Sequence, residues 1–288
     1  MKHRRTPLTV IAAKHTLPSV TDPDEHRAYV HTRHPGATLA TTAGTVLVHQ
    51  RSVLRRALDA HPAEELDRWV SATLHRIQHR GWPITLCSSI GPGAPATALI
   101  VEELNALGSP MIISVGTAAA LRTDLACGDL VVCDRALRGE STSAHYLPPG
   151  DHAHPDRHLT AALARAVADR GPRPRRGGTW TTDALYRESA VEVRLYARHG
   201  CLTADMEAAA LFAVGRYRRL PVAAAFVVAD SLVSRTPRTD HPSISGSLDL
   251  LLAAALDALA ACASDGPGTA ATRVGTGREH ENPEEQRG

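Results

Sequence analysis

The chain has 288 residues, enough to bury a substantial core as one large domain or two small ones. It carries 32 Lys and Arg against 30 Asp and Glu, so no broad basic surface indicates a nucleic acid partner. The five cysteines are odd in number and scattered, which favours reduced thiols over a disulfide framework or a metal site.

The hydropathy pattern predicts no export signal and no membrane span. Residues 1–5 are basic, but the apolar stretch at 7–13 is too short for a signal peptide. No segment is long and apolar enough to span a bilayer. We therefore expect a cytoplasmic protein without a membrane partner.

Helices and strands alternate in a βαβ rhythm through most of the chain, with no internal repeat and no low-complexity linker. This rhythm predicts an α/β fold with one domain. Residues 66–88 are ambiguous, because residues 75–79 alternate as in a strand, whereas Trp69, Val70 and Leu74 suit a helix.

Two turns of small residues, each after a predicted strand, are candidates for ligand binding. Residues 89–97 form a glycine-rich turn that runs into a helix at 95–107, with proline at its start and glycine after its end. A strand is expected at 110–115, followed by a second small-residue loop at 114–120 and a further strand at 129–134. Backbone amides in such turns approach an anion or a sugar closely, so we expect a ligand role for the pair.

Carboxylates at two element boundaries are candidates for the chemistry. The Ala-rich run at 208–214 predicts a helix, so Asp205 and Glu207 fall in its first turn, where the helix dipole favours acids. The apolar run at 221–229 predicts a buried strand that stops at Asp230. Ligands bind at the carboxyl ends of strands in open α/β sheets, so one pocket can hold all three acids. A helix cap and a loop aspartate would give the same pattern.

The remaining polar and terminal segments are less specific. Loops at 138–149 and 179–188 carry aromatic residues and suit either a binding site or a solvated connection. Residues 247–262 predict a strongly apolar helix. Residues 264–288 are rich in Gly, Thr, Glu, Arg and Pro, which is typical of a disordered tail and leaves 1–263 as the expected catalytic domain.

The order of these segments resembles the purine and uridine nucleoside phosphorylase superfamily over residues 86–232. The resemblance rests on seven ordered blocks: residues 90–104, 115–120, 128–132, 141–149, 181–188, 205–207 and 228–230. Upstream of them, a Gly-Asp-Pro-x-Arg phosphate loop is not legible. Its nearest candidate, residues 42–44 with Arg51 further on, lacks both the Asp-Pro and the spacing.

This resemblance implies a single-domain α/β fold with a mixed central sheet flanked by helices, and cleavage of a nucleoside N-glycosidic bond. Cleavage builds oxocarbenium character on the sugar and negative charge on the base, so the site needs sugar anchors and a proton donor. By position, Glu207 would accept hydrogen bonds from the ribose hydroxyls while Met206 packs on the sugar. Asp205, where many relatives have Glu, would hold the ribose or support the neighbouring turn.

The base site is implied by two further segments. Asp230 matches the aspartate that protonates the base at N7 in purine-cleaving relatives and that pyrimidine-cleaving relatives lack, which implies a purine nucleoside and a role in purine salvage. A carboxyl at the end of an apolar strand is desolvated, which helps it to keep that proton. Leu185 stands where relatives often stack an aromatic ring on the base, so Tyr186 becomes the stacking candidate, with Arg187 beside it, unless this segment is a plain helix-entry loop.

The phosphate site departs most from the family pattern. Gly116 and Thr117 match the family's phosphate-binding segment, and Gly91 lies in the other glycine-rich turn. The arginine that relatives carry three residues before Thr117 is Ser114 here. A substitute would have to come from elsewhere in the fold or from a neighbouring subunit; the candidates are Arg33, Arg51, Arg55 and Arg138.

The resemblance therefore implies a phosphorylase that takes a nucleoside and inorganic phosphate, with no metal and no further cofactor. It also implies a homo-oligomer, either a hexamer or a trimer. A nucleosidase that uses water is the alternative within catalysis. A catalytically silent nucleoside-binding protein is the alternative outside it, although a pure binder has no need of the proton donor Asp230.

Overall fold

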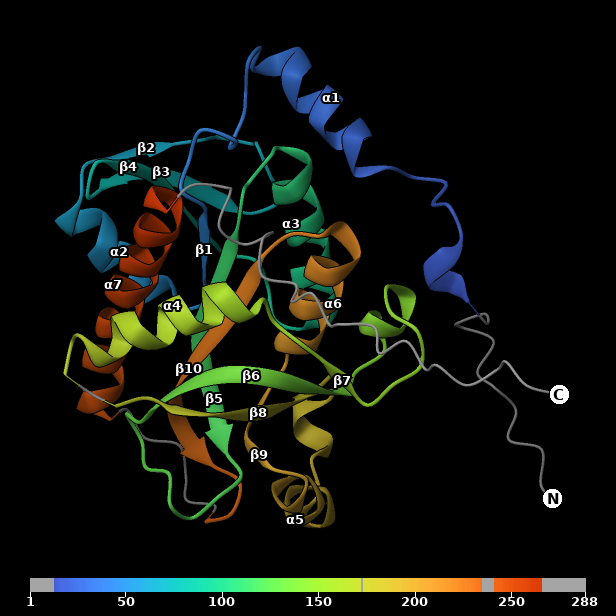
Figure 1. Cartoon of the computed structure of the whole chain (residues 1–288), viewed down its shortest axis with the longest axis vertical. Coiled ribbons are helices and arrows are strands. Elements are labelled where there is room, and N and C mark those ends of the chain that lie inside the picture. Colours follow the sequence, from blue (N-terminus) through green and yellow to red (C-terminus); the bar gives the residue numbers. More distant parts are fainter. Residues whose placement is uncertain (1–12, 172, 235–240, 266–288) are drawn as a thin grey trace, which may run out of the picture.

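One mixed β-sheet runs through the molecule, with helices packed on both of its faces (Figure 1). The computed structural model describes residues 13–171, 173–234 and 241–265. The strands follow the order β10-β6-β8-β9-β5-β1-β4-β3-β2, and β7 pairs with β6. Their bounds are β1 (Thr45–Val48), β2 (Ala63–Glu65), β3 (Thr73–His79), β4 (Trp82–Ser88), β5 (Ile112–Ala120), β6 (Leu130–Gly139), β7 (His152–Ala153), β8 (Arg175–Thr182), β9 (Cys201–Asp205) and β10 (Val222–Ser231).

Half of this sheet closes on itself. β10 pairs with β6 on one side and with β5 on the other, so β5, β10, β6, β8 and β9 form a closed ring of strands. β5 also pairs with β1 along residues 112–115 and with β9 at Ala119 and Ala120. This central position of β5 brings the ends of several strands to one place.

Four parallel strands end at the same edge of the sheet. β4, β1, β5 and β10 are parallel neighbours in that order. Their carboxyl ends, with the turns that follow β1 and β4, therefore lie close together in space. In α/β sheets this edge is where ligands bind.

Helices cover both faces of the sheet, as the α/β class predicted from the sequence requires. Two apolar clusters separate the faces: α2, α4 and α7 pack on one, and α3 and α6 on the other. Along β10, Ala225 and Val227 join the first cluster, whereas Ala224 and Phe226 join the second, because successive strand residues face opposite ways. The bounds are α1 (Pro23–Arg33), α2 (Arg51–Ala60), α3 (Ala94–Ala106), α4 (Arg157–Ala168), α5 (Ala190–Arg198), α6 (Ala208–Arg218) and α7 (Pro242–Ser264), with short 3-10 helices η1 (Lys14–Thr16), η2 (Thr142–His145) and η3 (Leu185–Arg187).

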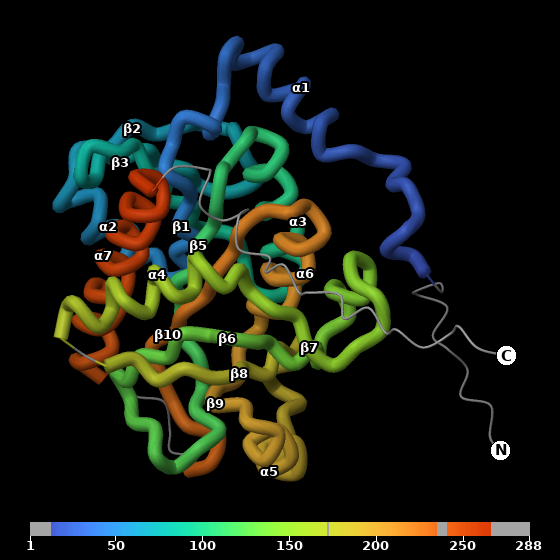
Figure 2. Tube along the Cα trace, viewed as in Figure 1, coloured from blue at the N-terminus to red at the C-terminus, as the bar shows by residue number. Residues whose placement is uncertain are grey.

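Residues 13–33 form an arm on the outside of the molecule (Figure 2). The arm comprises η1 and α1, and Val30 is the buried residue of α1. Several of its apolar side chains are exposed, with Val20 at 98% and Tyr29 at 56%. An arm with this much exposed apolar surface is suited to contact with another molecule.

α7 is longer than the apolar helix that the sequence predicts at residues 247–262. It has 23 residues and an 18-residue window with a mean hydropathy of 1.6, which by length and composition suffices to cross a bilayer. The expectation that no segment reaches this length and hydropathy was wrong. Here the helix packs against the sheet and against α4, with Leu251, Ala255 and Leu259 buried. Core helices share this composition, because a helix that is apolar on most sides needs burial.

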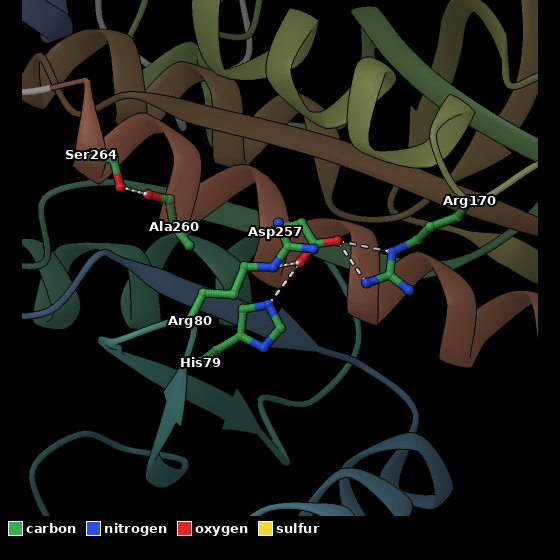
Figure 3. Close-up of polar contacts among 6 residues, drawn as sticks. All are labelled: His79, Arg80, Arg170, Asp257, Ala260 and Ser264. Atoms are coloured by element: carbon green, nitrogen blue, oxygen red, sulfur yellow. Dashed lines mark hydrogen bonds and ion pairs between the residues drawn. The ribbon is translucent and has the colours of Figure 1, made fainter.

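Asp257 on α7 joins segments that are far apart in the sequence (Figure 3). Its Oδ1 lies 2.7 Å from His79 Nε2 and 3.0 Å from Arg80 Nε, and its Oδ2 lies 2.6 Å from an amino nitrogen of Arg170. Burial opposes ionisation of Asp257, but the hydrogen bonds from His79 and Arg170 outweigh it and lower its pKa. One carboxylate thus ties α7 to the β3–β4 turn and to the end of α4.

The structure changes or decides three sequence expectations about elements. Residues 114–120 belong to β5 and pair with β10, so they are not a loop after the strand. In the segment 66–88, which the sequence left ambiguous, residues 73–79 and 82–88 form the antiparallel β3–β4 hairpin, whereas residues 66–72 lie in neither a strand nor a helix. The predicted tail begins inside α7, at Ser264, and its residues from 266 onward lie outside the described residues.

Candidate active site

A cleft of about 570 Å³ lies at the edge where the parallel strands end. The turns after β1 and β4, the ends of β5 and β10, the β9–α6 junction and η3 line it. Nine of the ten residues predicted from the sequence are in the lining: Gly91, Gly116, Thr117, Leu185, Tyr186, Asp205, Met206, Glu207 and Asp230. The structure therefore brings segments from across the chain into one cavity, as the resemblance implied.

Asp205 ends β9 and does not lie in the first turn of a helix, which corrects the sequence prediction. Its Oδ1 accepts hydrogen bonds from the hydroxyls of Thr181 at 2.8 Å and Thr179 at 3.1 Å. Its Oδ2 accepts from the amides of Ala208 at 2.6 Å and Glu207 at 3.0 Å. Four groups thus donate hydrogen bonds to this carboxylate, and Asp205 is only 6% exposed. Asp205 therefore supports the β9–α6 turn, the second of the two roles expected for it.

Glu207 precedes α6 as its N-cap residue and faces the cleft. The amide of Gly93 donates to its Oε1 at 2.7 Å, and the amide of Met206 donates to its Oε2 at 3.2 Å. Gly93 has a φ of +95°, which glycine adopts without the strain that a Cβ would add. The glycine-rich turn thus fixes the Glu207 carboxylate and leaves it further lone pairs for a ligand.

The two acids of this turn repel one another. Burial and, to a smaller extent, the charge of Glu207 together raise the pKa of Asp205 to about 6, although its hydrogen-bond donors oppose this rise. Burial also raises the pKa of Glu207, which the amides of Gly93 and Met206 oppose. Adjacent carboxylates in a cleft favour ligand groups that donate hydrogen bonds, such as the hydroxyls of a sugar.

Asp230 reaches the cleft from a different element. The pairing of β10 with β5 shifts after Val228, so that Ala229 is an extra residue and Asp230 pairs with Ala119. Such bulges re-aim side chains and are common beside active sites. β10 continues to Ser231, one residue beyond the predicted end. Asp230 is half-buried, and it lines the same cavity as Glu207.

Thr117 is held by a residue that the sequence patterns did not single out. The side-chain amide of Gln50 donates to Thr117 Oγ1 at 3.1 Å, so the threonine hydroxyl can donate its own hydrogen to a ligand. Gln50 Oε1 is buried and has no hydrogen-bond partner among the described residues. A ligand in the cleft that donates a hydrogen bond would satisfy it.

His49 lies beside Ser114, the position at which the family pattern has an arginine. His49 Nε2 lies 3.0 Å from Ser114 Oγ, and its ring packs over Gly116, where a Cβ would come within 3.2 Å of Cδ2. Burial lowers the pKa of His49 to about 4, although the charge of Asp205 opposes this. The ring is therefore neutral at pH 7 and does not restore the positive charge of the missing arginine.

Among the four arginines considered as substitutes, Arg51 is the one that lines the cleft. It begins α2, directly after Gln50. Arg33 and Arg138 make hydrogen bonds elsewhere, and Arg55 lies outside the lining. In the described part of the chain no three His, Cys, Asp or Glu side chains gather closely enough to hold a metal ion. The groups of the cleft that suit an anion are thus its amide, hydroxyl and guanidinium donors.

The base-binding candidates lie at the mouth of the cleft. Leu185 is 44% exposed and Tyr186 is 94% exposed, both on η3, and Arg187 is exposed outside the lining. The lining also contains the phenyl ring of Phe226 on β10, a residue that is only 3% exposed. Sequence reasoning missed Phe226 because an aromatic inside an apolar strand looks like an ordinary core residue.

The model of the phosphorylase superfamily matches residues 53–263 of this chain. A guanosine phosphorylase from Halorubrum lacusprofundi is 34% identical over 154 residues, which cover 54% of this chain and 64% of that protein. A uridine phosphorylase from Treponema pallidum is 33% identical over 171 residues, covering 54% and 66%. The chain thus aligns with just under two thirds of the length of these relatives.

A solved structure agrees with this assignment. The uridine phosphorylase from Vibrio fischeri ES114, complexed with 6-hydroxy-1-naphthoic acid, superimposes with a TM-score of 0.70 and 25% sequence identity. The superposition covers 77% of this chain and 92% of that one. The sheet, the cleft at its edge and the match over residues 53–263 together show that the chain belongs to the phosphorylase superfamily.

Proposed function

We propose that the protein is a nucleoside phosphorylase, which cleaves the N-glycosidic bond of a nucleoside with inorganic phosphate to give a free base and a sugar 1-phosphate. One observation carries the proposal: Glu207 and Asp230, from separate elements, line one cleft together with the hydroxyl of Thr117. A sugar-binding acid, a proton donor and an anion-binding hydroxyl are what this reaction needs in one place.

Each residue has a step in the proposed reaction. A phosphate oxygen bonds to the anomeric carbon as the bond to the base nitrogen breaks, and that electron pair passes to the base. Asp230 protonates the departing base, at N7 of a purine. Glu207 accepts hydrogen bonds from the ribose hydroxyls, and Met206 packs on the sugar. A purine nucleoside is the proposed substrate because Asp230 matches the aspartate that has this role in purine-cleaving relatives.

The anion side of the cleft bears less positive charge than the family pattern provides. Thr117, with the amides of Gly116 and Gly91, would hold phosphate, and Arg51 is the one arginine in the lining. Arginine binds phosphate bidentately, which a neutral hydroxyl does not replace. We therefore propose that phosphate binds more weakly here than in relatives that carry both arginines.

Hydrolysis is the second candidate, and the His49–Ser114 pair favours it. A neutral imidazole 3.0 Å from a hydroxyl offers hydrogen bonds but no charge, which suits water better than a phosphate dianion. In that case the same cleft would release a free sugar. The proton donor and the ribose anchor would keep their roles.

The proposal is tested by incubating the protein in phosphate buffer with a panel of purine and pyrimidine nucleosides. Chromatography of the reaction mixture measures the release of each base. We expect release from purine nucleosides and little from uridine. Comparable release in buffer without phosphate would transfer the assignment to the hydrolase. Binding of nucleosides by calorimetry without any base release would show a silent binding protein.

A further inference from the structure

A second large cavity lies at the end of the sheet opposite the cleft. Its volume is about 970 Å³, and it gathers the start of β8, part of β6, the first turn of α4 and the end of α6. Five of its lining residues are arginines, against two aspartates: Arg135, Arg157, Arg176, Arg216 and Arg219, with Asp134 and Asp156. We call this the basic cavity.

The two acids of the basic cavity are already engaged. Asp134 pairs with Arg135 at 3.0 Å, and Asp156 caps α4 by accepting a hydrogen bond from the amide of Leu159 at 2.8 Å. The other four arginines of the cavity make no side-chain hydrogen bond and no ion pair with any residue that the structure describes. Their positive charge is therefore available to a ligand.

Arg135 is held in place by the backbone around it. Its guanidinium donates to the carbonyl of Gly200 at 3.1 Å. A Cβ at Gly178 would lie 3.3 Å from Arg135 Cγ and Nε, and one at Gly200 would lie 2.6 Å from an amino nitrogen. Two glycines thus make the trough in which this arginine lies. A preformed guanidinium loses less conformational freedom when it binds an anion.

Two more features of the basic cavity indicate a ligand. Thr160 is 2% exposed and lines the cavity, and its hydroxyl lacks a hydrogen-bond partner in the part of the chain that the structure describes. Arg219 has a φ of +57°, at the end of α6, where glycine is the usual residue. A strained non-glycine residue at such a position suggests a role other than stability.

Helix capping alone does not account for this cluster. Arg216 and Arg219 lie at the C-terminal end of α6, where the negative end of the helix dipole attracts positive charge, and this arrangement is common. Arg157 and Arg176, however, come from the first turn of α4 and the start of β8. Four elements therefore converge with arginines on one cavity.

We propose that the basic cavity binds a polyphosphate anion through its phosphate groups. Arginines spread over four elements fit a chain of phosphates better than a single phosphate, and guanidinium groups bind phosphate oxygens in pairs. His154 is the lining residue with an aromatic ring, so the lining offers little stacking surface for a base. The phosphate chain is the part recognised, whether it belongs to an inorganic polyphosphate or to a nucleoside triphosphate.

The basic cavity is separate from the cleft, although two elements connect them. Val222 at the start of β10 lines the basic cavity, and Asp230 near its end lines the cleft, roughly 25 Å away at the usual rise of a strand. α6 likewise has Glu207 at one end and Arg219 just beyond the other. A polyphosphate here would thus occupy a site distinct from the substrates.

Calorimetric titration with sodium tripolyphosphate tests the proposal, carried out in orthophosphate buffer so that single-phosphate sites are already occupied. We expect one tripolyphosphate per chain, and at least tenfold weaker binding by the double variant Arg216→Gln and Arg219→Gln. The matched control, Arg194→Gln with Arg198→Gln on α5, removes the same charge outside the lining and should bind as the wild type does. A parallel titration with ATP distinguishes the sources, because equal affinity indicates recognition of phosphates alone and tighter binding indicates a nucleotide.

Arg219→Gly separates ligand binding from helix capping. Glycine relieves the positive φ, so this variant should melt at a higher temperature and yet bind tripolyphosphate more weakly. A more stable variant with unchanged binding would show that Arg219 only caps α6 and would overturn the assignment. The absence of tripolyphosphate and ATP binding by the wild type, or binding of a single-stranded oligonucleotide alone, would overturn it as well.

Discussion

Asp205 and Glu207 are two residues apart, and the structure gives them different tasks. Asp205 is saturated by two threonine hydroxyls and two amides, whereas Glu207 is held by two amides and faces the cleft. The first acid builds the turn, and the second is available to a ligand. Substitutions at the two positions should therefore affect different properties.

Asp205→Ala should destabilise the fold with a smaller effect on ligand binding. It leaves two amides at the start of α6 and the buried hydroxyl of Thr181 without their acceptor, which we expect to cost about 2–4 kcal/mol. Asp205→Asn keeps one oxygen and should cost less. Urea denaturation measures both free energies of unfolding. An alanine variant as stable as the wild type would show that the carboxylate does not support this turn.

Asp230→Asn and Glu207→Gln should lower turnover and leave folding nearly intact. Loss of a positioned general acid costs on the order of 10²- to 10⁴-fold in rate, so the effect at Asp230 should fall in that range. Glu207→Gln puts a donor where ribose hydroxyls need an acceptor. Steady-state kinetics measures turnover, and thermal melting checks the fold. Full activity of both variants on every cleaved nucleoside would refute the site assignment.

The sequence indicated the site residues that lie in an intact family motif. It missed the site residues that lie outside such a motif. Glu207 and Asp230 stand at element boundaries in a recognisable order. His49 and Gln50 also follow an apolar strand, residues 45–48, but no phosphate-loop signature marks them there. Their importance comes from contacts with Ser114 and Thr117, more than sixty positions away, which only the folded chain creates.

Besides its apolar packing, helix α7 makes a few polar contacts with the rest of the fold. Asp257 receives hydrogen bonds or ion pairs from His79, Arg80 and Arg170 and is 13% exposed as a side chain. Asp249 on the same helix pairs with Arg56, but its side chain is 44% exposed. The two aspartates therefore form a matched comparison on one helix.

Asp257→Asn should destabilise the protein by about 1–3 kcal/mol, since it weakens several charge-assisted hydrogen bonds in a partly buried site. Asp249→Asn should cost less than about 1 kcal/mol, as exposed pairs do. Because folding lowers the pKa of Asp257, its contribution is present above the ordinary aspartate pKa of about 4 and is lost as the pH falls through the lowered value. Denaturation at several pH values measures this, and equal losses from the two variants at neutral pH would contradict the account.

Element prediction succeeded where composition matched the local structure. The helix expected at 95–107 is α3, displaced by one residue, and the strand expected at 129–134 is the first part of β6. The prediction for β5 ended the strand too early, because the Ser, Gly, Thr and Ala residues in its second half have turn-like propensities. Pairing with β10 and β9 outweighs those propensities, and neither pairing is visible in the local sequence.

At the scale of the whole molecule, the exposed apolar residues predict self-association. Tyr186 at the mouth of the cleft is 94% exposed, and the arm exposes Val20 and Tyr29. The family resemblance implies a trimer or a hexamer, so light scattering should give about three or six times the chain mass of 30.7 kDa. Tyr186→Ser should then weaken nucleoside binding if the neighbouring chain covers this residue. A wild-type protein that is monomeric and cleaves nucleosides would refute the prediction of an oligomer.

The identity of the sugar product distinguishes phosphorolysis from hydrolysis. Purified protein is incubated in ¹⁸O-labelled water with phosphate and a purine nucleoside that it cleaves. The products are followed by phosphorus NMR and mass spectrometry. The account predicts sugar 1-phosphate without the label, formed at a rate that rises with phosphate concentration. Free sugar carrying ¹⁸O at the anomeric carbon, released at the same rate without phosphate, would contradict it.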